Sequence, residues 1–169
     1  MGNSFGGTVH RLDLPFEPCS SGTDLMILAR EERSNAYALS CGYTPSLTSR
    51  DRVECAALIT VRGVVQCIHG YPNEEAFWKD PRGDLSAGVY EVLESEWSDE
   101  IDAYNLATFG TTYLGDRSKR HFFIGGKDSS AQFLADSVSL DLFTDEPLLL
   151  SYRAALDEAL RRLDTYPEP

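Results

Sequence analysis

The chain has 169 residues, 42% of them hydrophobic and 11% aromatic, which is enough to bury one sizeable core and excludes wholesale disorder. Its 15 basic and 27 acidic residues give a formal net charge of −12, and the acids are scattered along the sequence. A surface of this charge repels phosphate backbones, so it disfavours binding to DNA or RNA. It can instead steer toward a basic protein partner, and the alternative is that the charge only maintains solubility.

The cysteines indicate neither a zinc site nor any other cofactor site, because they are widely spaced, form no Cys-x-x-Cys pair and have no histidine at ligand spacing. The first residues lack the basic flank and apolar run of a signal peptide, and no apolar stretch approaches the roughly 20 residues that span a bilayer. We therefore expect a cytoplasmic protein with reduced thiols and no membrane contact. Residues 1–169 are expected to form a single domain, with residues 1–7 as a frayed N-terminus.

The first part of the chain predicts β-structure. Residues 8–16 alternate in hydrophobicity before two prolines, residues 24–30 contain a short apolar run, and residues 36–43 alternate large and small side chains. Residues 53–69 give the densest apolar signal. With a tight turn at Arg62-Gly63, this segment is predicted to be a β-hairpin in the middle of a sheet.

The next elements are a strand and a helix. Residues 88–93 are rich in β-branched and aromatic side chains, and either Ser95 or Ser98 can cap the helix that follows, with acids in its first turn. Gly110 is a natural C-terminal stop. We expect this helix to pack on the sheet through an apolar stripe at helical spacing: Trp97, Ile101 and Tyr104.

A second hairpin is predicted from residues 120–124 and 131–135, which flank the turn sequence of residues 125–130 and continue into a strand over residues 137–143. The last helix is expected to start at a cap on Thr144 or Asp145 and to carry an ion pair between Asp157 and Arg161. Its predicted apolar stripe is Leu148 or Leu149, Tyr152, Leu156, Ala159 and Leu163.

These elements predict an α+β fold: a mainly antiparallel sheet of about six to eight strands, with the helices of residues 95–109 and 145–164 packed against it. Functional residues are most expected where the 53–69 segment ends, since a central strand there delivers a histidine, a tyrosine, an asparagine and acids into one turn. The alternative is that Pro72 and Asn73 only cap a short helix over residues 73–78. The candidate binding residues are Tyr71, Asn73, Glu74, Glu75, Trp78, Trp97 and Arg120.

Only three histidines are present, and two of them lie at predicted strand ends. If their strands are neighbours, His69 and His121 could form an acid–base pair oriented by Asp128, or a metal site with Glu74 or Glu75. For each histidine the alternative is a structural side chain bonded to a turn. Nucleotide binding is disfavoured because Gly125-Gly126-Lys127 lacks the spacing of a P-loop.

Three short motifs resemble a group of uncharacterised bacterial proteins: His69-Gly70-Tyr71-Pro72-Asn73-Glu74-Glu75-Ala76, Tyr90-Glu91-Val92 with Ser95 and Trp97, and Arg120-His121-Phe122 with Asp128-Ser129. The likeness covers roughly residues 53–136 and implies a bacterial source and an intact fold unit, without implying a reaction. In that group histidine tends to stand where this chain has Lys127, and an acid where it has Gln132. The resemblance therefore implies that a metal or acid–base site there is impaired in this chain.

The sequence supports two functional hypotheses. The first is a non-enzymatic bacterial interaction protein, of the inhibitor or immunity type, whose acidic surface meets a basic partner. The second is a small hydrolase or metal-dependent enzyme that uses His69, His121 and Asp128. The high negative charge and the absence of complete catalytic signatures favour the first.

Overall fold

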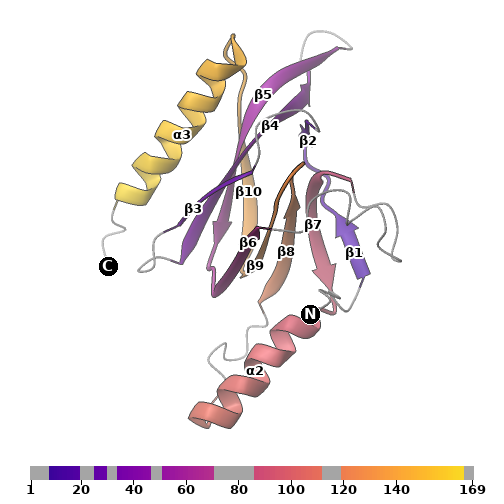
Figure 1. The fold of residues 1–169 in the computed structure, drawn as a ribbon, viewed down its shortest axis with the longest axis vertical. Helices are drawn as coiled ribbons and strands as arrows, with labels where there is room; N and C mark the ends of the chain where they lie inside the picture. Colours follow the sequence, from indigo (N-terminus) through magenta and orange to yellow (C-terminus); the bar gives the residue numbers. More distant parts are fainter. Residues whose placement is uncertain are drawn as a thin grey trace.

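Two antiparallel sheets and two helices form an α+β fold in the computed structural model, which describes residues 8–19, 25–29, 34–46, 51–70, 86–111 and 119–165 (Figure 1). Sheet A has the spatial order β1 (Thr8–Arg11), β7 (Gly88–Leu93), β8 (Arg120–Gly125), β9 (Ser130–Ala135) and β6 (Gln66–Gly70). Sheet B has the order β10 (Ser137–Phe143), β5 (Arg52–Arg62), β4 (Asn35–Pro45) and β2 (Glu17–Pro18), and β3 (Met26–Ala29) also pairs with β4. The helices are α2 (Glu96–Phe109) and α3 (Leu148–Asp164).

One two-stranded ribbon runs through both sheets. Its first strand is β5 followed by β6, and its second is β9 followed by β10. Arg62 pairs with Ser137 at the end of sheet B, and Gln66 pairs with Leu134 at the start of sheet A. Residues 63–65 thus lie opposite only residues 135–136, which is the extra residue of a β-bulge, and Gly63 has a φ of 66°. The bulge bends the ribbon from one sheet into the other.

The hairpin predicted for residues 53–69 is therefore wrong, although both of its strands exist. β5 pairs with β4 and β10, whereas β6 pairs with β9, so Arg62-Gly63 is a bend in a continuing strand. The local pattern of two apolar runs around a glycine is the same for a hairpin and for a bent strand. Partners far away in the sequence decide between the two.

The main core lies between the sheets. Alternate residues of β4 and β5 face alternate residues of β7, β8 and β9, and the buried set is Leu25, Ala36, Ala38, Ile59, Val61, Val89, Phe122, Ile124, Ala131, Phe133 and Ala135. The side chains of sheet A that point the other way are buried as well, with Tyr90, Val92 and Phe123 forming a second cluster. Buried residues on both faces explain why β8 and β9 are apolar without a strict alternation.

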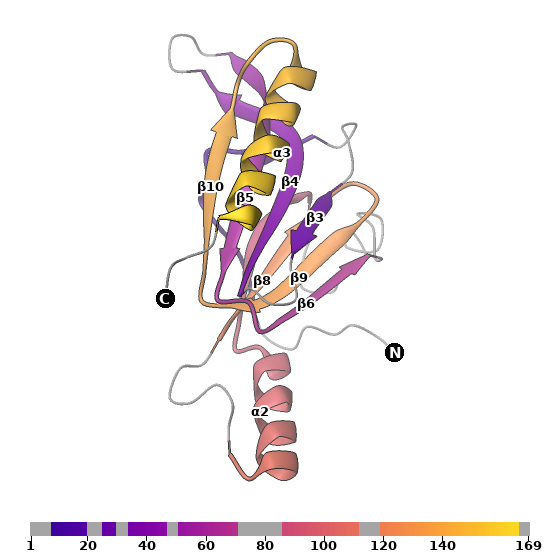
Figure 2. The same cartoon turned by 90° about the vertical axis from the view of Figure 1, so that its left-hand side faces the viewer.

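Helix α3 packs on the face of sheet B that points away from sheet A (Figure 2). Its buried line consists of small residues and one leucine, namely Ser151, Ala155, Ala159 and Leu163. Small residues let the helix approach the sheet closely, so the predicted Tyr152 and Leu156 lie at the flank of the contact. Arg162 ties the helix to the sheet, because its Nη1 donates to Thr60 Oγ1 at 3.1 Å and to Asp141 Oδ2 at 2.8 Å.

Two details predicted for α3 are wrong. The N-cap is Pro147 rather than Thr144 or Asp145, and the segment before the helix is held by a bond of 2.6 Å from Ser151 Oγ to the carbonyl oxygen of Asp145. The Asp157–Arg161 pair is also replaced. Asp157 lies 4.0 Å from Arg153, and Arg161 makes two bonds of 2.7 Å to Glu158.

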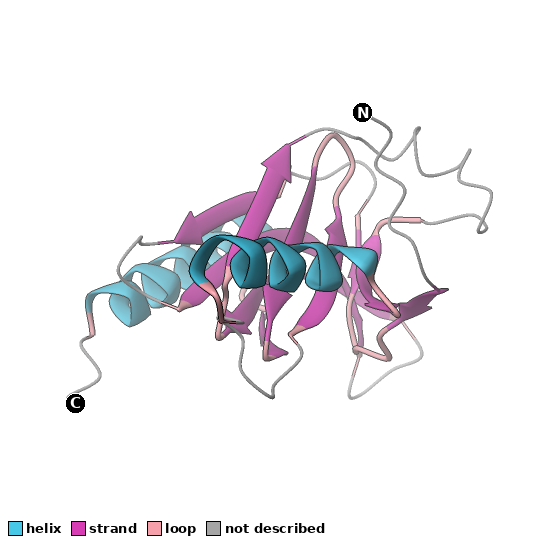
Figure 3. Cartoon of the chain, turned by 90° about the horizontal axis from the view of Figure 1, so that it is seen from below, coloured by secondary structure: helices cyan, strands magenta, loops and turns pink. Residues whose placement is uncertain are grey.

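Helix α2 has the predicted ends, with Ser95 as N-cap and Gly110 in the left-handed conformation at its C-terminus. It packs against sheet A through its first turn, where Ser98 is its one buried residue. The predicted packing stripe is therefore wrong beyond this turn, since Tyr104 is exposed. The rest of the helix extends beyond the strand ends, in front of them when the molecule is viewed from below (Figures 1 and 3). Among the described residues, neither helix is long and apolar enough to cross a membrane.

Gly63→Ala tests the bend of the ribbon. An added Cβ would clash with the carboxylate of Asp136 and stand 3.0 Å from the Asp136 Cβ, at a φ that alanine rarely adopts. We expect the free energy of unfolding to fall by roughly 2–3 kcal/mol. Gly110→Ala is the matched control, since its φ is 70° but nothing lies within 4 Å of the added Cβ, and it should cost only roughly 1 kcal/mol. Equal losses in urea denaturation would contradict the steric role of the bend.

The carboxylate of Glu158 should make α3 sensitive to acid. Hydrogen bonds from Arg161 and Arg162 lower the pKa of Glu158 from 4.5 to about 2. A carboxyl whose pKa is depressed by folding stabilises the native state above its ordinary pKa, and this contribution disappears as the pH falls through the folded value. Glu158→Gln should therefore melt at a lower temperature than the parent at neutral pH, and the difference should vanish between pH 4.5 and about 2. A constant difference over that range would contradict this assignment.

Candidate functional site

Three of the predicted candidates lie at one place, the junction of β7, β8 and α2. His121 and Arg120 are neighbours at the start of β8, and Trp97 lies in the first turn of α2. The Trp97 ring meets the His121 ring edge-on, with 5.0 Å between centroids and an interplanar angle of 72°. This junction is the candidate site.

The other predicted residues are elsewhere. His69 pairs with Ala131, which pairs with Ile124, three positions along β8 from His121. Directly paired residues lie on the same face of a sheet and neighbours along a strand alternate, so an offset of three residues places His69 and His121 on opposite faces of sheet A. Their strands are separated by β9, and this separation together with the offset along β8 puts their Cα atoms about 14 Å apart. Asp128 lies in the β8–β9 turn, at the far end of β8 from His121. The structure thus does not bring the predicted trio together.

The predicted binding residues Tyr71, Asn73, Glu74, Glu75 and Trp78, and with them the short helix predicted over residues 73–78, lie outside the described residues. No group of three or more histidine, cysteine or acidic side chains that could hold a metal ion occurs within the described ranges. The geometry of the described part therefore centres on His121.

His121 is buried, with 2% of its surface exposed, and both of its ring nitrogens have polar partners. Nδ1 lies 2.7 Å from Ser95 Oγ, and Nε2 lies 3.2 Å from Gln132 Oε1. Since a carbonyl oxygen only accepts, the neutral ring carries its proton on Nε2 and donates to Gln132. Nδ1 is then an acceptor for the hydroxyl of Ser95. The three side chains form one chain of hydrogen bonds in which the serine is the donor at its end.

The local sequence explains how Ser95 reaches the ring. β7 ends at Leu93, and Glu94 then adopts a φ of 57°, a left-handed conformation that costs energy for a residue with a Cβ. This turn places Ser95 at the N-cap of α2. Its hydroxyl makes no capping bond to the helix, because it is directed to His121 instead. A serine at the N-cap normally accepts a hydrogen bond from a backbone N–H of the first helical turn, whereas the hydroxyl of Ser95 bonds to the ring of His121.

A bidentate ion pair between β7 and β8 lies next to His121, on the opposite face of sheet A. Arg120 donates from Nε and Nη2 to the two carboxylate oxygens of Glu91, each at 2.6 Å, and its guanidinium lies 4.8 Å from the centroid of the Phe122 ring. The bonds from Arg120 lower the pKa of Glu91, and those to Glu91 raise the pKa of Arg120. Both groups stay charged at neutral pH, and their charges offset one another.

A hollow of about 420 Å³ opens at this junction. Ser95 and His121 are part of its wall, so the hydrogen-bonded pair faces space that a small molecule can enter. The remaining lining residues are contributed by the end of β7, the first turn of α2 and the start of β8: Glu91, Val92, Leu93, Glu94, Ser98, Asp99, Lys119 and Arg120.

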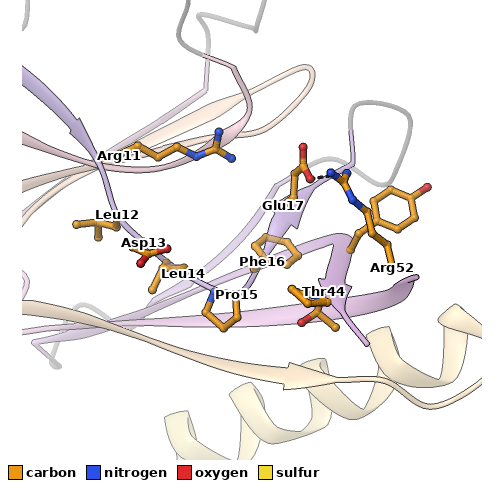
Figure 4. Close-up of a pocket in the computed structure, with 11 residues that line it drawn as sticks. Arg11, Leu12, Asp13, Leu14, Pro15, Phe16, Glu17, Thr44 and Arg52 are labelled. Carbon is orange, nitrogen blue, oxygen red and sulfur yellow. Dashed lines mark ion pairs between the residues drawn. The ribbon is translucent and has the colours of Figure 1, made fainter. Parts of the chain in front are cut away.

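Other hollows in the described part have a less reactive lining. One of about 480 Å³ lies where the chain passes from β1 to β2, and Figure 4 shows the ion pair of Arg52 with Glu17 at its rim. Another, of about 680 Å³, lies beside the start of α3 between Arg52 and the acids Glu54, Asp145 and Glu146. Neither contains a serine, cysteine or histidine, so neither offers a nucleophile with its base.

Two of the cysteines are unsuited to a second reactive centre. None of the four forms a disulfide bond. Burial raises the pKa of Cys55 and of Cys67 to about 11 each, so these two thiols are protonated at neutral pH and are poor nucleophiles.

Comparisons with protein-family models, with curated proteins and with solved structures found no match to this chain. The functional argument therefore rests on the residues of this chain alone.

Sequence reasoning missed the contacts of Ser95 and Gln132. Ser95 is predicted only as a helix cap, and Gln132 appears only as a difference from similar proteins. A signal was present: His121 and Gln132 are polar residues on the same face of an otherwise apolar hairpin. Because His121 lies opposite Leu134, Gln132 is its diagonal neighbour across the hairpin. Two polar side chains in that relation are expected to bond to each other when buried.

Gln132→Leu tests the hydrogen-bond chain. The substitution leaves the buried Nε2–H of His121 without its acceptor, so we expect a loss of roughly 1–3 kcal/mol in unfolding free energy. Gln66→Leu is the matched control at an exposed position of β6 and should change the stability by less than about 0.5 kcal/mol. In the parent protein, long-range ¹⁵N–¹H NMR should place the ring proton of His121 on Nε2. A proton on Nδ1 would show that the bonds run in the opposite sense.

Proposed function

We propose that this protein binds a basic protein partner along helix α2, as an inhibitor or immunity-type protein does. The observation that carries the proposal is the composition of the exposed part of this helix. Residues 96–109 include four acids and no basic residue; Glu96, Asp99 and Glu100 are exposed, and Asp102 is half-buried. Together with the formal charge of −12, this gives a negative surface that attracts and orients a positive one.

Exposed apolar side chains on the same helix support a specific contact rather than general repulsion of other acidic molecules. Tyr104, Leu106 and Phe109 are 64%, 56% and 67% exposed, and the Tyr104 and Phe109 rings are 6.5 Å apart in an edge-on arrangement. Aromatic side chains of this kind act as anchors when a partner covers them, while the charges around them increase the rate of encounter.

The orientation of α2 makes this surface available. Only its first turn contacts sheet A, and the remainder projects away from both sheets (Figure 2). By contrast, α3 lies along sheet B and buries one side. Most of the stability of a helix in a protein comes from packing, and α2 packs little against its own chain. Contact with a partner would therefore stabilise this helix further.

Charge neutralisation tests this proposal. The triple variant Glu96→Gln, Asp99→Asn and Glu100→Gln removes three exposed acids from α2. The control variant removes the same residue types from the opposite end of the molecule: Glu54→Gln, Asp145→Asn and Glu146→Gln. All three proteins carry a photo-crosslinking residue at position 109. The parent and the control should capture proteins of high isoelectric point from the cells that make this chain. The α2 variant should give a yield of captured protein that is lower by at least about tenfold.

Salt provides a second measurement. Capture should decline between about 0.1 M and about 1 M salt, where the screening length falls from about 10 Å to about 3 Å. A crosslinking residue at position 149, on exposed α3, should capture no basic protein preferentially. Capture that is indifferent to salt, equal losses in the two charge variants, or partners without excess basic charge would each count against the proposal.

A further inference from the structure

We infer that Ser95 is a nucleophile for acyl transfer, with His121 as its base, and that the hollow beside it accepts small esters of cationic alcohols. This activity goes beyond the proposed binding function and does not depend on it. The observation behind it is that a serine hydroxyl, a buried imidazole and an acceptor for the second ring nitrogen stand in one hydrogen-bonded line.

The protonation pattern of that line is the one that general-base catalysis requires. Gln132 Oε1 accepts from Nε2–H of His121, which leaves the lone pair of Nδ1 directed at Ser95 Oγ at 2.7 Å. Gln132 is thus a positioning residue, which fixes the ring proton on the nitrogen away from the serine. Because its amide is neutral, it stabilises an imidazolium less than a carboxylate would, and the predicted reaction is correspondingly slow.

The start of α2 supplies hydrogen-bond donors for the oxyanion that the nucleophile would create. The first backbone N–H groups of a helix have no partner within the helix, and the Ser95 side chain does not cap them. They lie in the same turn as Ser98 and Asp99, which line the hollow. An oxyanion that forms on a carbonyl attacked by Ser95 can accept from these N–H groups, aided by the positive end of the helix dipole.

The turn before the serine fits this role. Glu94 holds the left-handed φ of 57° at the point where strand β7 passes into α2. A non-glycine residue in this conformation is retained where the surrounding structure fixes it, and such residues concentrate at functional sites. Here the turn directs the hydroxyl to the imidazole instead of to the helix.

The charges of the hollow define the substrate class. Arg120 is paired with Glu91, and Lys119 with Asp136, so both cations of the lining are compensated. Glu94 and Asp99 have no ion-pair partner among the described residues, and they leave the hollow negative. The volume of about 420 Å³ suits a small molecule. A positively charged alcohol portion of an ester is therefore favoured over a neutral or negative one.

The reaction proceeds through an acyl-serine. Ser95 Oγ attacks the ester carbonyl carbon while its proton passes to Nδ1 of His121, which gives a tetrahedral oxyanion. The bond to the alcohol oxygen then breaks, and Nδ1 returns the proton to that oxygen, so the alcohol leaves. Water attacks the acyl-serine with Nδ1 as base again, and the products are the carboxylic acid and free Ser95.

Covalent labelling is the first test. A fluorophosphonate probe forms a bond from serine oxygen to phosphorus and releases fluoride, and it reacts with activated serines. Intact mass and peptide mapping of the full chain should show one adduct, at Ser95. Ser86→Ala, which removes an exposed serine outside the junction, should label like the parent, and Ser95→Ala should not label. No adduct on the folded parent, or adducts spread over several serines, would overturn the inference.

Hydrolysis is the second test. Acetic acid release from acetylcholine should exceed that from its neutral isostere 3,3-dimethylbutyl acetate by about fivefold in kcat/KM. Ser95→Ala should lower kcat/KM for acetylcholine by about 100-fold or more. Gln132→Glu should raise kcat, and Gln132→Leu should lower it by about tenfold, with KM changed less in both. Equal rates for Ser95→Ala and the parent would overturn the inference.

Ser95→Cys keeps the inference testable if other variants unfold. The thiol at position 95 should react with iodoacetamide faster than any of the four native cysteines, because His121 can take its proton. A melting curve equal to that of the parent confirms folding. Reaction at position 95 that is no faster than at the native thiols would show that His121 does not act as a base there.

Discussion

The bulged ribbon formed by β5–β6 and β9–β10 is the constraint on which the rest of the structure depends. It is the only continuous strand pair that belongs to both sheets in the described part of the chain, so the bend at Gly63 determines how sheet A faces sheet B. The same β9 strand pairs with β8 and carries Gln132. The bend therefore also holds in place the strand that orients His121, which pairs with Leu134, the last residue of β9 before the bulge.

At the junction of β7, β8 and α2, the same hydrogen bonds affect both the stability of the fold and the reactivity of Ser95. A buried histidine is costly unless its ring nitrogens are satisfied, and here Ser95 and Gln132 satisfy them. The same contacts give the ring a fixed proton position and place the hydroxyl of Ser95 at the lone pair of Nδ1. The network that makes the burial of His121 tolerable is thus also the network that would activate Ser95, and α2 begins at this point.

Local patterns were sufficient for much of the fold. β7 was predicted as residues 88–93, α2 was predicted with a cap at Ser95 or Ser98 and a stop at Gly110, and β8 and β9 were predicted as a hairpin, since each depends on nearby residues. The pairing of β5 was mispredicted because partners distant in the sequence decide it. The cap of α3 was mispredicted although its contacts are local, since the helix starts after Pro147 and Ser151 bonds to the carbonyl oxygen of Asp145. The candidate site was half predicted. His121 and Trp97 are in contact, whereas the side chain of Arg120, the preceding residue of β8, lies on the other face of sheet A with Phe122 and Glu91. The partners Ser95, Gln132 and Glu91 could not be predicted without the register between strands.

The lengths of the outer strands have a consequence for self-association. Sheet A ends in β1 and β6, of four and five residues, and the free side of β4 is divided between β2 and β3, of two and four residues. Short segments give another copy of the chain few consecutive amide groups to pair with, which discourages growth from these edges into fibrils. The remaining edge of sheet B is β10, with seven residues. The interruption between β2 and β3 thus protects the long, apolar β4, which as a bare edge would be the most hazardous strand in the molecule.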